Sequence, residues 1–284
     1  MERIFKYIDL SDKEFTLFSS LIYDKAGINL GLHKKELLKN RLRKRMRELD
    51  IDNFKSYFKY ITEVDKSGEE LSIMLTAIST NVTYFFREDN HFKLLSEKIL
   101  PELVASKQAK SVKTFKVWSA GCSSGEEPYT LSITLQEFLK NKGYWNIYIL
   151  GTDISHNALE KAKRGVYKVE STKHVPDHLL RHYFLKGYDE MKNMVKVKKH
   201  VKEVVDIEYL NFKDDSYSVP GNFDFIFCRN VLIYFDKETQ AALINKFKKH
   251  LVAGGHLFLG HSEGLTGRLA GLKHIAPSVY VKTE

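Results

Sequence analysis

The segment FKVWSAGCSSGEEPY, residues 115–129, constrains the fold of this chain more than any other stretch. An apolar, β-prone run around Val117 and Trp118 breaks into a loop that holds Gly121 and Gly125, and a helix-forming stretch follows at once. A strand, a glycine loop and a helix start in this order form ligand sites in open α/β sheets, because ligands bind beyond the carboxyl ends of the strands. The segment therefore predicts such a sheet with a small-molecule pocket at this loop.

The chemistry of the loop restricts the ligand. Its glycine spacing differs from the dinucleotide fingerprint and from a phosphate-binding loop, which ends in Gly-Lys-Ser/Thr. Glu126 and Glu127 open the following helix, and two carboxylates there would repel a phosphate. They suit a cationic ligand rich in hydroxyl and amine groups. S-adenosylmethionine fits, because it carries a sulfonium, an α-amino group and a ribose diol.

Residues 1–78 are predicted to form an all-α domain. Ser11 and Glu14 have the spacing of a capping box, so a first helix begins there, and Gly27 can end it. Apolar residues at helical spacing predict three further helices, at roughly 33–49, 53–63 and 68–78. Four short amphipathic helices predict a small bundle.

The second predicted domain covers residues 79–284, and strands alternate with helices from about residue 111. Strands are expected at 115–119, 146–151, 204–209, 223–228 and 255–260, and helices near 126–140, 155–164 and 237–250. This alternation predicts a Rossmann-like, mainly parallel sheet. A last strand, at 278–282, is expected to pair antiparallel in a hairpin.

An insertion lies between the second helix and the third strand, at about 166–203. It contains MVKVKKHVKEVV, which alternates like an antiparallel hairpin and unlike a crossover helix. The expected fold class is therefore α/β: a Rossmann-like domain with a small inserted antiparallel β-subdomain, preceded by an all-α N-terminal domain.

The net charge of +9 indicates an acidic partner, such as nucleic acid, an anionic membrane surface or an acidic protein. The basicity is concentrated, because residues 34–47 hold eight basic side chains and only one acid, Glu36. A solvated helix face and a docking surface both fit such a segment, and the local imbalance favours docking.

The chain is expected to be cytoplasmic and free of metal. Its start, MERIFKYIDL, lacks the basic-then-apolar order of a signal peptide, and no run approaches the roughly 20 apolar residues of a membrane span. Cys122 and Cys228 lie outside any zinc-ligand spacing. The tripeptide His261-Ser262-Glu263 holds triad residue types, but sequence neighbours cannot form that geometry.

Polar side chains follow three of the predicted strands. Asp153 ends the second strand, where a carboxylate can hold both hydroxyls of a ribose or can cap the next helix. Asn211 and Phe212 end the third strand, where an adenine would lie, and a turn Asn and a core Phe fit these positions equally well. Arg229 and Asn230 end the fourth strand; buried polar groups need partners, which a cofactor would supply.

Two further features flank these strands. Residues 78–92 precede the first strand, and polar Asn81, Thr83 and Arg87 interrupt their apolar pattern, which suits a lid over the cofactor. Tyr234 follows the fourth strand. Its hydroxyl could reach the methyl-transfer centre, or the ring could be a packing aromatic with an exposed tip.

Together these segments resemble the CheR family of chemotaxis receptor methyltransferases. The matching motifs are TNVTYFFRE (80–88), SAGCSSGEEPY (119–129), TDIS (152–155), NF (211–212), FCRNVLIYF (227–235) and GGHLFLGHSEGL (254–265). They occur in the order of the family, and the match covers nearly the whole chain, including the helical domain and the inserted hairpin.

The resemblance implies an S-adenosylmethionine-dependent enzyme that methylates glutamate side chains of chemoreceptors for chemotactic adaptation and releases S-adenosylhomocysteine. It implies Arg87 and Tyr234 as catalytic residues beside the transferred methyl group. The residues implied to bind the cofactor are Asn81, Thr83, Arg87, Glu127, Asp153, Asn211, Phe212, Asn230 and Val231. No general base is required, because a free glutamate has a pKa of about 4.3 and is already ionised.

The implied partner is the cytoplasmic helical region of a chemoreceptor, reached at membrane-bound arrays without insertion into the membrane. Docking by complementary charge is expected at Lys39, Arg43, Arg45 and Arg47. In some family members the inserted hairpin, with a glycine-rich loop, binds a tethering peptide of the receptor. The loop here, KGYDEMKNM, has only Gly187, which argues against tethering. Nothing in the sequence requires more than a monomer.

A nucleic-acid methyltransferase of the same fold is the main alternative, because the chain is basic. Amino-group methylation of bases uses an Asn/Asp-Pro-Pro-aromatic signature after the fourth strand. Here that position reads Arg229-Asn230-Val231-Leu232, which argues against nucleic acid as a substrate. A binding module that keeps the cofactor only as a signal is a third possibility, and the intact catalytic set argues against it.

Overall fold

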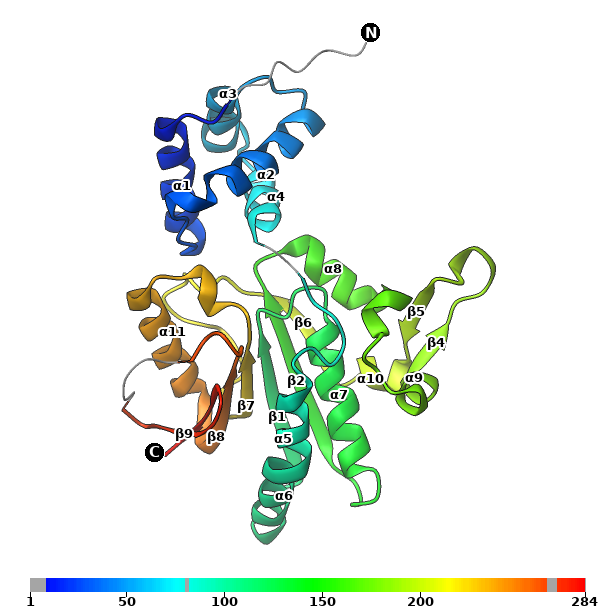
Figure 1. Cartoon of the computed structure of the whole chain (residues 1–284). Helices are drawn as coiled ribbons and strands as arrows, with labels where there is room; N and C mark the ends of the chain where they lie inside the picture. Colours follow the sequence, from blue (N-terminus) through cyan, green and yellow to red (C-terminus); the bar gives the residue numbers. More distant parts are fainter. Residues whose placement is uncertain (1–8, 80–81, 265–269, 284) are drawn as a thin grey trace.

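The computed structural model describes residues 9–79, 82–264 and 270–283. They form a helical domain and an α/β domain, and the helical domain faces the carboxyl ends of the central strands (Figure 1). Among the described residues, no helix combines the length and the apolar character needed to cross a membrane.

The helical domain contains the four predicted helices. They are α1 (Asp12–Ala26), α2 (Lys35–Glu48), α3 (Phe54–Lys59) and α4 (Glu69–Ile78), with a 3-10 turn at Leu32–Lys34 and a π turn at Tyr60–Val64. The capping box is confirmed, because Ser11 and Glu14 each accept a hydrogen bond from the backbone N–H of the other. Gly27, at φ 71°, ends α1 in the left-handed conformation that favours glycine.

The α/β domain is built on a seven-stranded sheet with the order β6-β2-β1-β7-β8-β10-β9. Its strands are β1 (Thr114–Ala120), β2 (Asn146–Asp153), β6 (Val205–Tyr209), β7 (Phe223–Cys228), β8 (Leu251–Leu259), β9 (Leu272–Ala276) and β10 (Val279–Lys282). The first five strands in this order are parallel, and β10 is antiparallel to β8 and β9. The mainly parallel sheet and the terminal hairpin are therefore confirmed.

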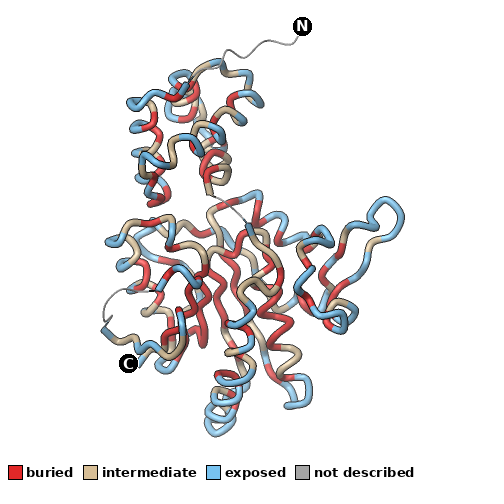
Figure 2. The backbone as a smooth tube through the Cα atoms, viewed as in Figure 1, coloured by how far each residue is buried: buried red, intermediate tan, exposed pale blue. Residues whose placement is uncertain are grey.

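The strand order also locates the ligand site. The chain moves from β1 outward to β2 and β6, and then continues at β7 and β8 on the other side of β1. The topological switch point therefore lies between β1 and β7, and open α/β sheets bind ligands in the crevice at this point. All six residues of β7 are buried, and Figure 2 shows the central strands as the buried part of the domain.

The sheet is flanked by helices, three of which follow the predicted ranges. These are α7 (Glu126–Leu139), α8 (His156–Arg164) and α11 (Lys237–His250). A helical run before β1 was not expected; it comprises α5 (Asp89–Leu94), a π turn (Leu95–Ile99) and α6 (Leu100–Ala109). The strand expected at 255–260 begins earlier, because Leu251 follows α11 directly and already pairs with Phe223 of β7.

The inserted subdomain has its own antiparallel sheet in the order β3-β5-β4. Its elements are β3 (Val166–Lys168), a 3-10 turn (Val169–Thr172), α9 (Asp177–Tyr183), β4 (Phe184–Lys186), a 3-10 turn (Asp189–Met191), β5 (Met194–Val197) and α10 (Lys199–Lys202). The hairpin is confirmed for β4 and β5. The prediction of a hairpin is wrong for the second half of the MVKVKKHVKEVV segment. There the chain forms α10 and buries Val201.

Candidate active site

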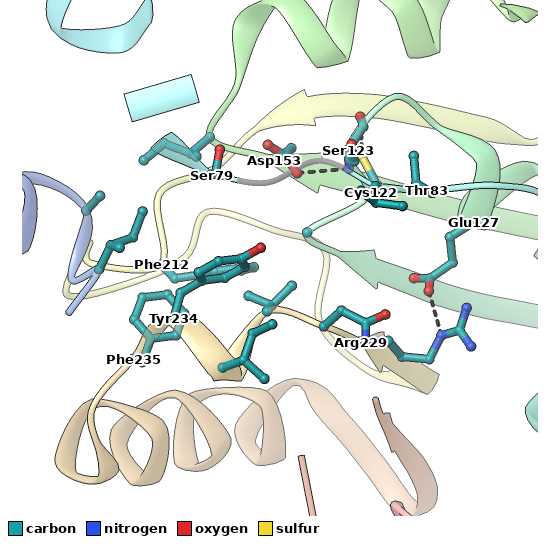
Figure 3. Close-up of a pocket in the computed structure, with 18 of the residues that line it drawn as sticks. Ser79, Thr83, Cys122, Ser123, Glu127, Asp153, Phe212, Arg229, Tyr234 and Phe235 are labelled. Atoms are coloured by element: carbon teal, nitrogen blue, oxygen red, sulfur yellow. Dashed lines mark hydrogen bonds and ion pairs between the residues drawn. The ribbon is translucent and has the colours of Figure 1, made fainter. Parts of the chain in front are cut away.

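A cavity of about 420 Å³ lies at the carboxyl ends of β1, β2 and β7, at the topological switch point. It is lined by the residues predicted for the site, apart from Asn81, which lies outside the described residues. These are Thr83, Arg87, Glu127, Asp153, Asn211, Phe212, Asn230, Val231 and Tyr234, most of which appear in Figure 3. Ala26 and Ile28 of the helical domain, and Ser79 directly after α4, also line the cavity. The sequence did not indicate this contribution from the helical domain.

The glycine loop between β1 and α7 is fixed against the neighbouring strands. Gly121 and Gly125 have φ of 84° and 96°, which favours glycine at both positions. The N–H groups of Gly121 and Cys122 each donate to the carbonyl of Thr152 at 2.8 Å. A Cβ atom on Gly121 would collide with the side chain of Val231. At Gly121 the loop therefore presents only backbone to Val231, whereas Cys122 and Ser123 of the same loop line the cavity.

Asp153 lies at the end of β2 with its carboxylate at the cavity. Oδ2 accepts from the backbone N–H of Ser123 at 2.8 Å (Figure 3), and Oδ1 accepts from that of Ser155 at 2.9 Å. The N-cap of α8 is Ser155, whose hydroxyl accepts from Ala158, so Asp153 is not the cap. Burial raises the pKa of Asp153. A carboxylate has about four lone-pair sites, which leaves acceptors for two further donors.

Glu127, in the first turn of α7, is held from two sides. Ser119 Oγ donates to Oε1 at 2.7 Å, and Arg229 Nε donates to Oε2 at 2.7 Å (Figure 3). The Arg229 side chain is 2 % exposed. From the sequence, a cofactor was expected to supply the partner of this buried cation; the structure shows that Glu127 is a partner. A buried pair of this kind fixes geometry more than it adds stability.

Arg229 also holds the linker that carries Arg87. Its Nη1 donates to the carbonyl of Arg87 at 2.6 Å and lies 3.6 Å from Oε2 of Glu88 and 3.4 Å from Nδ1 of His91. Burial, together with the charge of Arg229, lowers the pKa of His91 to about 4. His91 is therefore neutral at pH 7, and sequence spacing gave no sign of this buried network.

Glu88, His91 and His261 bring three potential metal-ligand atoms within 4.8 Å of one another. The guanidinium of Arg229 already faces two of these groups, and its charge would repel a metal cation placed among them. The arrangement fits an ion-pair network better than a metal centre. The expected absence of a metal stays a prediction.

Asn230 is held by two carboxylates in a left-handed conformation, with φ 60°. Its backbone N–H donates to Oε2 of Glu263 at 2.7 Å, and its Nδ2 donates to Oε1 of Glu88 at 3.2 Å. Glu263 is 6 % exposed and also accepts from the backbone of Gly260 and Ile233. Glu263 belongs to the tripeptide whose triad residue types cannot form a triad; the structure shows that it fixes the loop after β7.

Tyr234 ends a 3-10 turn, Leu232–Tyr234, and its hydroxyl points into the cavity (Figure 3). Its carbonyl accepts from the N–H of Asn29 at 2.7 Å, and Lys34 Nζ lies 5.9 Å from its ring centroid. The ring also packs against the core of the helical domain. Tyr234 thus joins the two domains and lines the cavity, and its catalytic role stays a prediction.

Asn211 and Phe212 line the cavity but also have other contacts. The Nδ2 of Asn211 donates to the carbonyl of Lys25 at 2.7 Å, and its Oδ1 accepts from the N–H of Lys213 at 3.0 Å. The ring of Phe212 lies 5.7 Å from that of Phe247 in the core. The bond to Lys213 is the turn contact and the Phe247 pair is the core contact left open by the sequence, whereas the bond to Lys25 joins Asn211 to α1 of the helical domain. A contact with adenine stays a prediction.

The predicted docking residues on α2 have different environments. Lys39 pairs with Glu36 at 2.6 Å and with Asp9 at 3.0 Å, and its side chain is 12 % exposed. Arg43 is half-buried, whereas Arg47 is exposed.

Arg45 turns toward the interior of the helical domain. Its Nη2 and Nε donate to Glu70 at 2.6 and 3.0 Å, and Tyr57 donates to the same carboxylate at 2.7 Å. Glu70 is 4 % exposed, so this is an internal ion pair. The geometry therefore gives Arg45 an internal structural contact. The docking role expected for it, and for Lys39, Arg43 and Arg47, stays a prediction.

Comparisons with known proteins agree with this architecture. Residues 81–281 match the model of the CheR methyltransferase SAM-binding domain, and residues 13–79 match that of the CheR methyltransferase all-alpha domain. A chemotaxis protein methyltransferase of Borreliella burgdorferi is 37% identical over 97% of this chain and 96% of its own length. One from Salmonella typhimurium is 36% identical over 97% and 92%, and one from Escherichia coli is 38% identical over 90% and 86%.

Proposed function

The chain belongs to the CheR methyltransferase family, and we propose that its S-adenosylmethionine-dependent activity methylates glutamate side chains of chemoreceptors, forming glutamyl methyl esters for chemotactic adaptation. The observation that supports this most strongly is the cavity at the switch point, where Glu127, Asp153 and Arg87 line one space. Two fixed carboxylates suit the amine and hydroxyl groups of the cofactor, and a guanidinium suits a substrate carboxylate.

The residues of the cavity fit S-adenosylmethionine. We expect Asp153 to accept from the ribose hydroxyls and Glu127 to accept from the α-amino group, because both carboxylates are already oriented by internal donors. Phe212 would face the adenine. The other residues expected to contact the cofactor are Asn81, Thr83, Arg87, Asn211, Asn230 and Val231.

The bound cofactor supplies a methyl group activated by a sulfonium. The protein must orient the incoming glutamate and exclude water, because an ionised carboxylate already has the electron pair that forms the ester bond. We assign the orienting role to Arg87, with Tyr234 beside the transferred methyl group. Neither residue has to remove a proton, so the cavity requires no general base.

The receptor would dock on the helical domain by charge. Arg41, Lys44 and Arg47 lie three residues apart on α2 and are exposed, so they form a basic face that an acidic helical surface can approach. We place the enzyme in the cytoplasm, as a monomer recruited to receptor arrays. The inserted hairpin is not expected to bind a tether, because its loop has Gly187 as its single glycine.

A methyl-transfer assay tests this function. The protein is incubated with methyl-labelled S-adenosylmethionine and a cytoplasmic chemoreceptor fragment, and the product is then treated with mild base. Label released as volatile methanol identifies a carboxyl methyl ester and supports the proposal. Base-stable label on added RNA, with none on the receptor, would favour the nucleic-acid alternative.

A further inference from the structure

The linker around Arg87 has a strained backbone. Phe86 and Glu88, on either side of Arg87, have φ of 57° and 56°, in the left-handed region that non-glycine residues rarely adopt. Such conformations are unfavourable for residues with a side chain and persist only where the surrounding structure holds them. The linker must therefore be held by its surroundings, which on the Glu88 side are Arg229 and Asn230.

Phe85 anchors the linker on its other side, because its side chain packs into the inserted subdomain. Its side chain is 0 % exposed, and its ring centroid lies 5.0 Å from that of Tyr167 on β3 and 5.0 Å from that of Phe184 on β4. Both ring pairs are edge-to-face, at 89° and 85°. The backbone N–H of Phe85 donates to the carbonyl of Ser171 at 3.0 Å. The linker is thus joined to the subdomain through both side chain and backbone.

Tyr167 gives the subdomain a second contact, with the glycine loop. Its hydroxyl donates to the carbonyl of Ser124 at 2.8 Å. A Cβ atom on Gly125 would lie 2.9 Å from the hydroxyl oxygen of Tyr167. Burial raises the pKa of Tyr167 well above its usual value, so the hydroxyl remains a donor. One aromatic side chain of β3 therefore touches both Phe85 and the loop that precedes Glu127.

We infer that the inserted subdomain is a positioning element for methyl transfer, which uses Phe85 to hold the strained linker at Arg87 and Tyr167 to hold the glycine loop. The subdomain thus has an internal role that does not depend on any peptide bound at its hairpin. The inference rests on the proposed function, because it assumes that Arg87 orients the substrate. By contrast, the exposed hairpin tip, seen at the outer edge of the subdomain in Figure 2, does not take part.

The linker contact is tested with Phe85→Leu, which keeps an apolar side chain and removes the ring contacts. We expect kcat to fall about 10- to 100-fold, because a small displacement of an orienting group has such an effect, while affinity for S-adenosylhomocysteine changes less. Phe115→Leu is the matched control: Phe115 is also 0 % exposed but lies at the start of β1, away from the cavity. It should lower the melting temperature with kcat within about twofold of wild type.

The loop contact is tested with Tyr167→Phe, which removes one hydroxyl. We expect the dissociation constant of S-adenosylhomocysteine, measured by calorimetry, to rise about three- to tenfold, as for the loss of one hydrogen bond. Tyr188→Phe removes the same group from the hairpin loop of the same subdomain, where Tyr188 is 79% exposed. It should leave the dissociation constant unchanged.

The outcomes separate this inference from the proposed function. If wild-type protein methylates the receptor fragment but Phe85→Leu loses no more kcat than Phe115→Leu, the linker contact has no positioning role and the inference fails. It fails equally if Tyr167→Phe binds as tightly as Tyr188→Phe. If wild-type protein gives no base-labile receptor methylation, the proposed function itself fails, whatever the variants show.

Discussion

The cofactor cavity and the basic helix α2 both depend on charged side chains but use them in opposite ways. In the cavity, Arg229 is almost fully buried and pairs with Glu127 at 2.7 Å. On α2, Arg41 and Lys44 are exposed to solvent. Buried charges are held in one geometry and are costly to leave unpaired, whereas exposed charges act at a distance and are screened by salt. Variants in the cavity should therefore have large effects on stability, cofactor affinity or kcat. Variants on α2 should have smaller effects on receptor binding, which weaken as salt is added.

The largest expected effect is the loss of the buried cation. Arg229→Met would leave Glu127 buried without its partner and should lower the free energy of unfolding by about 3–5 kcal/mol, measured by urea denaturation. The same change at exposed Arg47 should alter it by less than about 0.5 kcal/mol. An equal loss of unfolding free energy in the Arg229 and Arg47 variants would contradict the difference between buried and exposed charges.

The next effect concerns cofactor binding. Asp153→Ala removes a carboxylate that the cavity holds ready, and we expect the affinity for S-adenosylhomocysteine to fall about 100-fold or more, since bonds to charged groups contribute about 1.5–3 kcal/mol each. Exposed Asp215 provides the control, as Asp215→Ala should bind normally. Retained micromolar affinity in Asp153→Ala would contradict the assigned role.

Arg87→Ala should separate transfer from binding. We expect kcat to fall about 10- to 100-fold and the affinity for S-adenosylhomocysteine to fall less, because the guanidinium orients the substrate carboxylate. Arg181→Ala, at an exposed position of the inserted subdomain, should behave like wild type in both measurements. Equal losses in kcat and in cofactor affinity would assign Arg87 to the cofactor alone.

Charge reversal on α2 should act on receptor binding only. Lys44→Glu combined with Arg47→Glu is expected to raise the KM for the receptor fragment about five- to tenfold at low salt, with cofactor affinity unchanged. The effect should shrink as salt is added, because exposed charges are screened. A KM that stays at the wild-type value would place docking on another surface.

The smallest expected effect is acid sensitivity from the buried network. The folded pKa of His91 is about 4, below the value of 6.5 for a free histidine, so the unfolded chain binds the proton first. The contribution of neutral His91 to the free energy of unfolding is therefore present above pH 6.5 and is lost as the pH falls toward 4. Acidification from pH 8 to 6 should cost about 0.8 kcal/mol through His91. His91→Gln should remove this part of the pH dependence, whereas His178→Gln at an exposed position should retain it.

The two regions also differ in how far the sequence predicts them. The cavity follows from local rules, because the end of each strand, the glycine loop and the start of α7 must meet at one edge of the sheet. The helical wall, with Ala26 and Ile28, could not be predicted, since it depends on how two domains pack.

Individual charges on α2 were harder to predict. Helical spacing identifies the buried apolar stripe, but it does not show that Arg45 reaches Glu70, 25 residues away. In the sequence, Glu70 has the position of an ordinary acid in the first turn of α4. Glu263 posed the same difficulty. The backbone groups that donate to its carboxylate come from the loop after β7 and from Gly260, and they meet only in the folded chain.

A crystal structure of the protein with S-adenosylhomocysteine would show whether the cavity at the carboxyl ends of β1, β2 and β7 is the cofactor site. We expect the ribose hydroxyls on the Asp153 carboxylate, the amino group at Glu127 and the sulfur facing Arg87 and Tyr234. A ligand bound elsewhere, such as in the second cavity, of about 460 Å³, between α5, α7 and the inserted subdomain, would contradict it.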